Sequence, residues 1–199
     1  MTVSVYADPS GSYATMSIGG SEKFRLNSDG TATLSGAPVL RSALVATKSA
    51  TGNFVDFTSA TNSGIPSWAK KVKIVFNGVG TPGVYDVKVQ LYAANTLVTT
   101  GYTSSVVYLV GGVSPVFQGH TSAVWVVGSS TATVVSGKCE LDLQTSNTWV
   151  ATGQVQRLND SACQIASGQI SLAGILTGLR IEATSGTFDA GSISVYVEG

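Results

Sequence analysis

The sequence predicts an all-β protein: an antiparallel β-sandwich, jelly-roll-like in topology, preceded by a short N-terminal segment of β-hairpins. Two observations predict this fold. Apolar and polar residues alternate in run after run, which is the period of a half-buried strand. Joints rich in Gly, Ser and Thr separate these runs at the spacing of a sandwich or barrel. The helical apolar pattern is missing from the sequence; residues 165–176 come nearest to it, and glycines flank or interrupt them.

The first forty residues differ from the rest. Their short runs are joined by Gly19-Gly20 and by Asn27-Ser28-Asp29-Gly30, sequences that favour hairpins because such turns need positive φ. They hold too few apolar residues for a core, so the segment must dock on its own sandwich, on sister chains or on another component. We therefore expect an attachment segment over 1–40 and a sandwich over 41–199, with Gly36-Ala37-Pro38 as a short linker. The expected strands of the segment are 13–18, 22–27 and 31–34.

The clearest strand of the sandwich lies at 71–76. Val72, Ile74 and Phe76 face one side there, and Lys71 and Lys73 face the other. The other expected strands are 53–57, 84–92, 106–110, 123–127, 131–135, 139–144, 148–156, 179–183 and 192–197.

The composition indicates a chain that works as part of an assembly. Only 11% of the residues are charged, and 11 basic residues balance 11 acidic ones. Long-range repulsion therefore gives little protection from association. Zero net charge also offers nothing to a phosphate backbone, so we expect no nucleic-acid partner. The basic cluster Lys70, Lys71 and Lys73 alternates with apolar residues, as the solvent side of a strand does.

The two cysteines, Cys139 and Cys163, are too few for a disulfide framework in a chain of this size. Cys139 alternates with Leu141 and Leu143, which predicts a buried thiol, and we expect both cysteines to react slowly. The start has no signal-peptide pattern, and the longest apolar run is far too short for a membrane helix. We therefore expect a soluble protein made in the cytoplasm, without membrane insertion.

No catalytic, cofactor or metal site is expected, and we do not expect an enzyme. The run from Gly78 to Gly83 matches G-x-G-x-x-G, but a strand follows it where a dinucleotide site needs a helix, so a hairpin loop is favoured. His120 is the single histidine and lacks a nucleophile elbow. The carboxylates are scattered singly, so nothing selects the pair that glycan hydrolysis needs.

Binding leaves a fainter signal in the aromatic residues. Tyr102 lies in the loop-like run 99–105, so we expect it to be exposed, and Tyr102 and Tyr108 are the candidate receptor contacts, since aromatic rings stack on sugars. Trp125 and Trp149 lie in apolar strands, where core packing is expected.

Two segments carry a family resemblance. Gly64-Ile65-Pro66-Ser67-Trp68-Ala69-Lys70 is followed by Phe76-Asn77-Gly78-Val79, and Phe188-Asp189-Ala190-Gly191 stands near the end. Both resemble segments in the C-terminal β-domains of bacteriophage tail-associated proteins. The ending Val195 to Gly199 departs from the family pattern by two residues. The resemblance covers about residues 45–199.

The resemblance implies a non-enzymatic virion protein: a small tail fibre or tail-tip protein for host attachment, made in the host cytoplasm and located in the virion. It also implies a homotrimer whose residues 1–40 bind other virion proteins and whose distal loops contact a host surface glycan or protein. A capsid decoration or head-fibre protein is the alternative. A glycan depolymerase is disfavoured because the chain lacks a carboxylate pair and a β-helix repeat.

Overall fold

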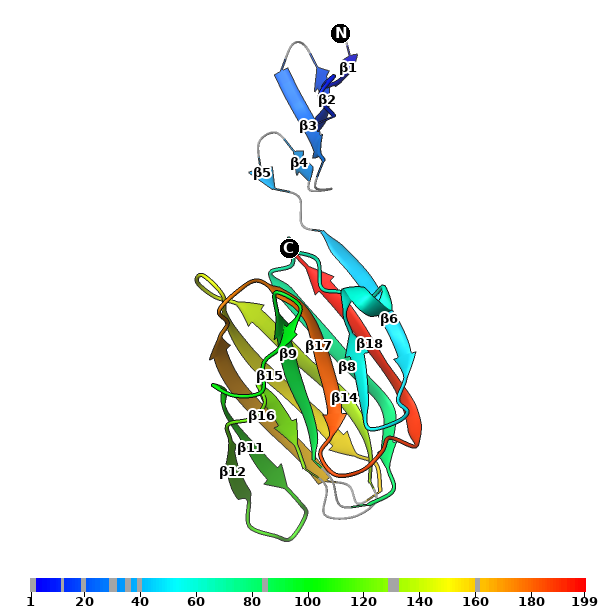
Figure 1. Cartoon of the computed structure of the whole chain (residues 1–199), viewed down its shortest axis with the longest axis vertical. Coiled ribbons are helices and arrows are strands. Elements are labelled where there is room, and N and C mark those ends of the chain that lie inside the picture. Colours follow the sequence, from blue (N-terminus) through cyan, green and yellow to red (C-terminus); the bar gives the residue numbers. More distant parts are fainter. Residues whose placement is uncertain are drawn as a thin grey trace. The chain divides into compact units, whose positions relative to one another are not determined.

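The computed structural model describes residues 3–11, 13–18, 21–28, 32–34, 37–38, 41–83, 86–128, 133–159 and 162–199. Apart from one 3₁₀ turn at Ser59–Thr61, the regular structure in these ranges consists of strands, paired antiparallel (Figure 1). Within them no helix is long and apolar enough to cross a membrane. The chain divides into two compact units, Met1–Ser42 with Glu198–Gly199 and Ala43–Val197. The expected all-β antiparallel fold is confirmed.

The N-terminal unit is a single sheet whose strands follow in chain order, β1-β2-β3-β4-β5. Strands were expected at 13–18 and 22–27, whereas the first strand was not. A two-residue strand also lies within the run expected to be a linker. The joint Gly19-Gly20 and residues 29–31 lie outside the described residues. The strands are β1 (Val3–Ala7), β2 (Tyr13–Ile18), β3 (Ser21–Asn27), β4 (Ala32–Leu34) and β5 (Ala37–Pro38).

The second unit is a sandwich of a large and a small sheet. The large sheet has the order β12-β11-β16-β15-β14-β8-β18-β6; the small one has the order β10-β9-β17-β7, and β13 also pairs with β9. The large sheet contains β6 (Ser42–Ser49), β8 (Lys71–Thr81), β11 (Thr103–Leu109), β12 (Val116–His120), β14 (Thr133–Leu143), β15 (Thr148–Arg157), β16 (Ala162–Ser171) and β18 (Ala190–Glu198). The small sheet contains β7 (Phe54–Phe57), β9 (Val87–Ala93), β10 (Thr96–Leu97), β13 (Trp125–Val127) and β17 (Leu176–Ala183).

The strand order contains a jelly roll. The chain crosses between the sheets from β6 through β7 and β8 to β9, and again from β17 to β18. This gives the neighbouring sets β6-β18-β8-β14 and β7-β17-β9-β13, which is the pairing order of a jelly roll. The remaining strands are insertions: β10 to β12 lie between β9 and β13, and β15 and β16 lie between β14 and β17. Of these, β11, β12, β15 and β16 widen the large sheet, and β10 extends the small one. The expected jelly-roll-like topology is confirmed.

The core lies between the two sheets. Trp125 of the small sheet is fully buried and stacks on Phe76 of the large sheet, with ring centroids 5.4 Å apart. Trp149 and Cys139 are buried as well, as expected. The runs 131–135 and 139–144 were expected as separate strands, but residues 133–143 form one strand, β14, with a register shift between Val135 and Gly137. Residues 131 and 132 lie outside the described residues.

Cys163 is more exposed than the expected slow reaction of both cysteines implies. Its neighbours Ala162 and Gln164 point into the core, so Cys163 lies half-buried on the outer side of β16, where its Sγ accepts a hydrogen bond from Gln154 at 3.1 Å. Burial raises the pKa of the Cys139 thiol well above its ordinary value. We predict that a thiol reagent labels native Cys163 more than about tenfold faster than Cys139. Mass spectrometry of the labelled chain measures both rates; equal rates would contradict the register of β16.

The two segments that carry the family resemblance contact each other. Phe188 is buried, and the N–H of Asp189 donates to the carbonyl of Gly80 at 3.1 Å. Gly191 has φ +89°, and a Cβ added there would lie 2.2 Å from the carbonyl oxygen of Gly78. Within the G-x-G-x-x-G match, Gly80 also serves close packing between β8 and β18, because a Cβ added there would lie 2.6 Å from Oδ1 of Asp189. The expected hairpin loop is wrong for residues 78–81, which belong to β8.

Candidate binding face

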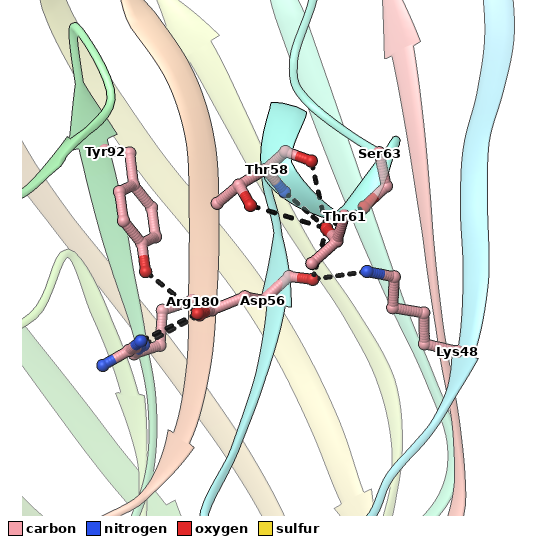
Figure 2. A network of polar contacts seen from close by, with 7 residues as sticks. All are labelled: Lys48, Asp56, Thr58, Thr61, Ser63, Tyr92 and Arg180. Atoms are coloured by element: carbon pink, nitrogen blue, oxygen red, sulfur yellow. Dashed lines mark hydrogen bonds and ion pairs between the residues drawn. The ribbon is translucent and has the colours of Figure 1, made fainter.

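A polar network joins three strands on the outer side of the small sheet (Figure 2). Arg180 of β17 donates to both carboxylate oxygens of Asp56 in β7, at 2.8 and 2.7 Å. The hydroxyl of Tyr92 in β9 donates to the same carboxylate at 3.0 Å. The guanidinium lies 3.8 Å from the centre of the Phe54 ring. The hydrogen bond with Asp56 raises the pKa of Arg180, and burial raises the pKa of Tyr92.

The backbone of Asp56 is held as firmly as its side chain. Lys48 donates to its carbonyl oxygen at 2.6 Å, and Thr61 donates to the same oxygen at 3.3 Å (Figure 2). Burial lowers the pKa of Lys48. The polar atoms of this network thus bind one another and fasten strands together. We assign this network a structural role because the carboxylate of Asp56 already accepts three hydrogen bonds.

Glu140 of β14 in the large sheet is engaged in the same way. Glu140 accepts a hydrogen bond from Lys138 at 2.8 Å and forms an ion pair with Lys71 at 3.4 Å. The hydrogen bond from Lys138 lowers the pKa of Glu140. Across the described ranges, no group of three or more His, Cys, Asp and Glu residues could hold a metal ion.

The two tyrosines expected to contact a receptor point inward. Tyr102 is only 2% exposed; its hydroxyl donates to the carbonyl of Val98 at 2.8 Å and accepts from the N–H of Leu91 at 2.9 Å. The expected exposure of Tyr102 is therefore wrong, because backbone partners satisfy its hydroxyl inside the core. Tyr108 lies on the same inward side of β11, half-buried, and its hydroxyl donates to Gln118 at 3.0 Å.

The burial of Tyr102 has a measurable pH dependence. Burial raises its pKa to about 12, whereas an unfolded tyrosine ionises near pH 10. The stability that Tyr102 contributes is therefore complete below about pH 10 and is lost as the pH rises toward 12. We predict that the free energy of unfolding falls by about 2 to 3 kcal/mol over this window because of Tyr102. Denaturant titrations of Tyr102→Phe should show a shallower fall, and an unchanged pH profile would contradict the buried hydroxyl.

The large sheet has a charged half and an uncharged half. Between Lys88 and Lys138 the chain contains no Asp, Glu, Lys or Arg, and this stretch supplies β11 and β12. The adjoining β16 is also free of these residues, and β15 is free of them up to Gln156. The neighbouring strands β8 and β14 carry most of the charges of the sheet: Lys71, Lys73, Lys138, Glu140 and Asp142. The others are Lys48 in β6, Glu198 in β18 and Arg157 at the end of β15.

A shallow groove of about 340 Å³ lies in the uncharged half. Thr103 stands opposite Gln169, and Ser105 stands opposite Ser167, so the groove presents hydroxyl and amide groups from β11 and β16. Val150 of β15 lines it as well. Hydroxyl and amide groups both donate and accept hydrogen bonds, so they suit a ligand that does the same.

Apolar side chains border the groove on the next row of the sheet. Val107 stands opposite Phe117 in β12 and opposite Ile165 in β16. Phe117 is 77% exposed and Ile165 is 45% exposed. We call the groove and this apolar row together the uncharged face. The sequence signal that could have located it is the long stretch without charge, combined with the outward positions of β11.

Comparison with known proteins identified no relative of this chain. The chain matches no protein-family model, and it matches no curated protein.

Proposed function

We propose that the chain is a non-enzymatic structural protein of a bacteriophage virion, a small tail-fibre or tail-tip protein. This proposal is supported by a contact between the two segments that resemble phage tail proteins, residues 76–79 and residues 188–191. They lie far apart in the sequence, yet Gly191 packs on Gly78 and Asp189 bonds to Gly80. Gly78 and Gly191, which both match the phage pattern, thus lie in contact between β8 and β18, and this supports a resemblance that extends over the folded sandwich.

In this proposal the uncharged face contacts the host, and its ligand is a neutral surface glycan. The hydroxyl and amide groups of the groove match sugar hydroxyls, which both donate and accept. The exposed ring of Phe117 and the side chain of Ile165 offer an apolar surface to the C–H face of a sugar. A protein ligand fits less well, because the cores of protein interfaces are depleted in serine and enriched in arginine and aromatic residues.

Binding of labelled protein to host cells tests this role. We predict that Phe117→Ala weakens binding by more than about tenfold, because an exposed aromatic anchor is lost. Gln169→Ala, in the groove, should weaken it as well. Asn77→Ala is the matched control, since Asn77 is exposed in β8 in the charged half of the same sheet. Unchanged binding by both groove variants, or an equal loss with the control, would contradict a host contact at this face.

A further inference from the structure

The groove of the uncharged face lies between two rows of outward side chains that cross the large sheet. Residues directly opposite each other in antiparallel strands point to the same side, so each row continues from strand to strand. Across β11, β16, β15 and β14 in turn, one row is Ser105, Ser167, Thr152 and Glu140, and the other is Thr103, Gln169, Val150 and Asp142. A ligand that follows the groove past Val150 therefore reaches β14, where it meets two carboxylates.

The two carboxylates at the β14 end of the rows differ in their partners. Glu140 accepts a hydrogen bond from Lys138 and pairs with Lys71. Lys71 stands directly opposite Asp142 in the register of β8 and β14, yet its Nζ lies 3.4 Å from Glu140. No hydrogen bond or ion pair joins the carboxylate of Asp142 to another residue of the described ranges. Asp142, half-buried beside the end of the groove, thus keeps both carboxylate oxygens available to a ligand.

A free carboxylate at the end of a row of hydroxyl and amide groups restricts the chemistry of the ligand. An ionised carboxylate only accepts hydrogen bonds, and these are stronger than hydrogen bonds between neutral groups. Two hydroxyls on neighbouring carbons of a sugar ring supply one donor for each carboxylate oxygen. A sugar that carries its own carboxylate or phosphate is repelled at this position, because like charges raise the energy of the complex.

We propose that the glycan site extends onto β14 and that Asp142 determines its specificity. A linear neutral oligosaccharide lies across β11, β16, β15 and β14, a span of about 14 Å at the usual spacing of neighbouring strands. Its hydroxyls bond to Thr103 and Gln169, a C–H surface lies over Val150, and two neighbouring hydroxyls donate to Asp142. Acidic glycans are excluded by the carboxylate. This inference rests on the proposed glycan contact, to which it adds the direction of the ligand and the residue that selects it.

An array of neutral oligosaccharides and of oligosaccharides with uronic or sialic acids tests the inference with the full chain, and binding to host cells is measured in parallel. Asp142→Asn removes the charge and keeps one acceptor oxygen, whereas Asp142→Ala removes both oxygens. Glu182→Gln is the matched control, because Glu182 is a half-buried carboxylate on the outer side of the small sheet. The slow labelling of Cys139 reports that the sandwich of each variant is folded.

We expect the wild-type chain and Glu182→Gln to bind the same neutral oligosaccharides and the same cells. Asp142→Ala should weaken both by about tenfold or more, because hydrogen bonds to a charged group are lost. Asp142→Asn should weaken them less and should bind acidic oligosaccharides that the wild type rejects.

Two results would overturn the inference and leave the proposed host contact standing. One is unchanged binding of both Asp142 variants to the sugars or cells that the wild type binds. The other is a wild-type chain that prefers acidic oligosaccharides. A wild-type chain that binds neither the array nor host cells would overturn the proposed glycan contact, and the inference with it.

Discussion

Gly191→Ala is expected to destabilise the protein by more than about 3 kcal/mol, which is at the severe end for a single substitution. The added Cβ would lie 2.2 Å from the carbonyl oxygen and 2.4 Å from the carbonyl carbon of Gly78. Both are backbone atoms of β8, so no side chain can swing aside, and β8 and β18 would have to separate. Chemical denaturation of the variant measures the loss.

Gly101→Ala is the control that separates two causes of the loss in Gly191→Ala: the clash with Gly78 and the positive φ. Gly101 has φ +85°, almost the same as the +89° of Gly191, but no atom lies within 4 Å of its added Cβ. Its replacement should therefore cost only the positive φ, about 1 to 2 kcal/mol. Equal losses for the two variants would show that Gly191 is required for its conformation rather than for the contact with β8.

Gln164→Met should cost about 2 to 5 kcal/mol. Gln164 is fully buried, and its side-chain amide donates to the carbonyl of Gly128 at 2.6 Å and accepts from the N–H of Gly128 at 3.0 Å. These two bonds link β16 of the large sheet to the end of β13 in the small sheet. Methionine has a similar length but leaves both backbone groups of Gly128 without this partner.

Gln169→Met is the control for this change, because Gln169 is exposed on the same strand. Its unfolding free energy should stay within about 0.5 kcal/mol of the wild type. A Gln164→Met variant as stable as this control would contradict the prediction. It would mean that water satisfies the backbone of Gly128 and that the two hydrogen bonds between the sheets contribute little to the free energy of unfolding.

Gln164 also explains why strand β16 could not be predicted from the sequence. Alternation predicted the strands in which every inward position is apolar, such as 71–76. In β16 the inward residue Gln164 is polar, so the pattern was lost and the strand was not expected. The half-buried outer position of Cys163 was therefore missed, and this cysteine was expected to react as slowly as Cys139. Ser104 has the same effect in β11, where its hydroxyl donates to the carbonyl of Ala123 at 2.9 Å. The expected loop over 99–105 therefore extended into β11, which begins at Thr103; residues 99–102 do lie outside any strand. Tyr102 was wrongly expected to be exposed, because this loop residue places its hydroxyl on buried backbone partners.

The candidate face was hidden for a different reason. Its residues come from β11, β12, β15 and β16, and only their pairing brings Thr103, Gln169 and Val150 together. The sequence does contain the uncharged stretch from Lys88 to Lys138. However, which of its residues face outward depends on the register, and inward polar residues had obscured that register.

The location of the protein in an intact particle tests the central claim most directly. Antibodies against the sandwich, residues 41–199, can be bound to purified particles of any phage whose genome carries this sequence and viewed by electron microscopy. The account predicts label at the tail, and predicts that a chain beginning at Arg41 folds but is not incorporated, because the N-terminal sheet is missing. Label on the capsid would favour a decoration or head-fibre protein. Unlabelled particles, with the protein left in the host lysate, would contradict a role in the virion.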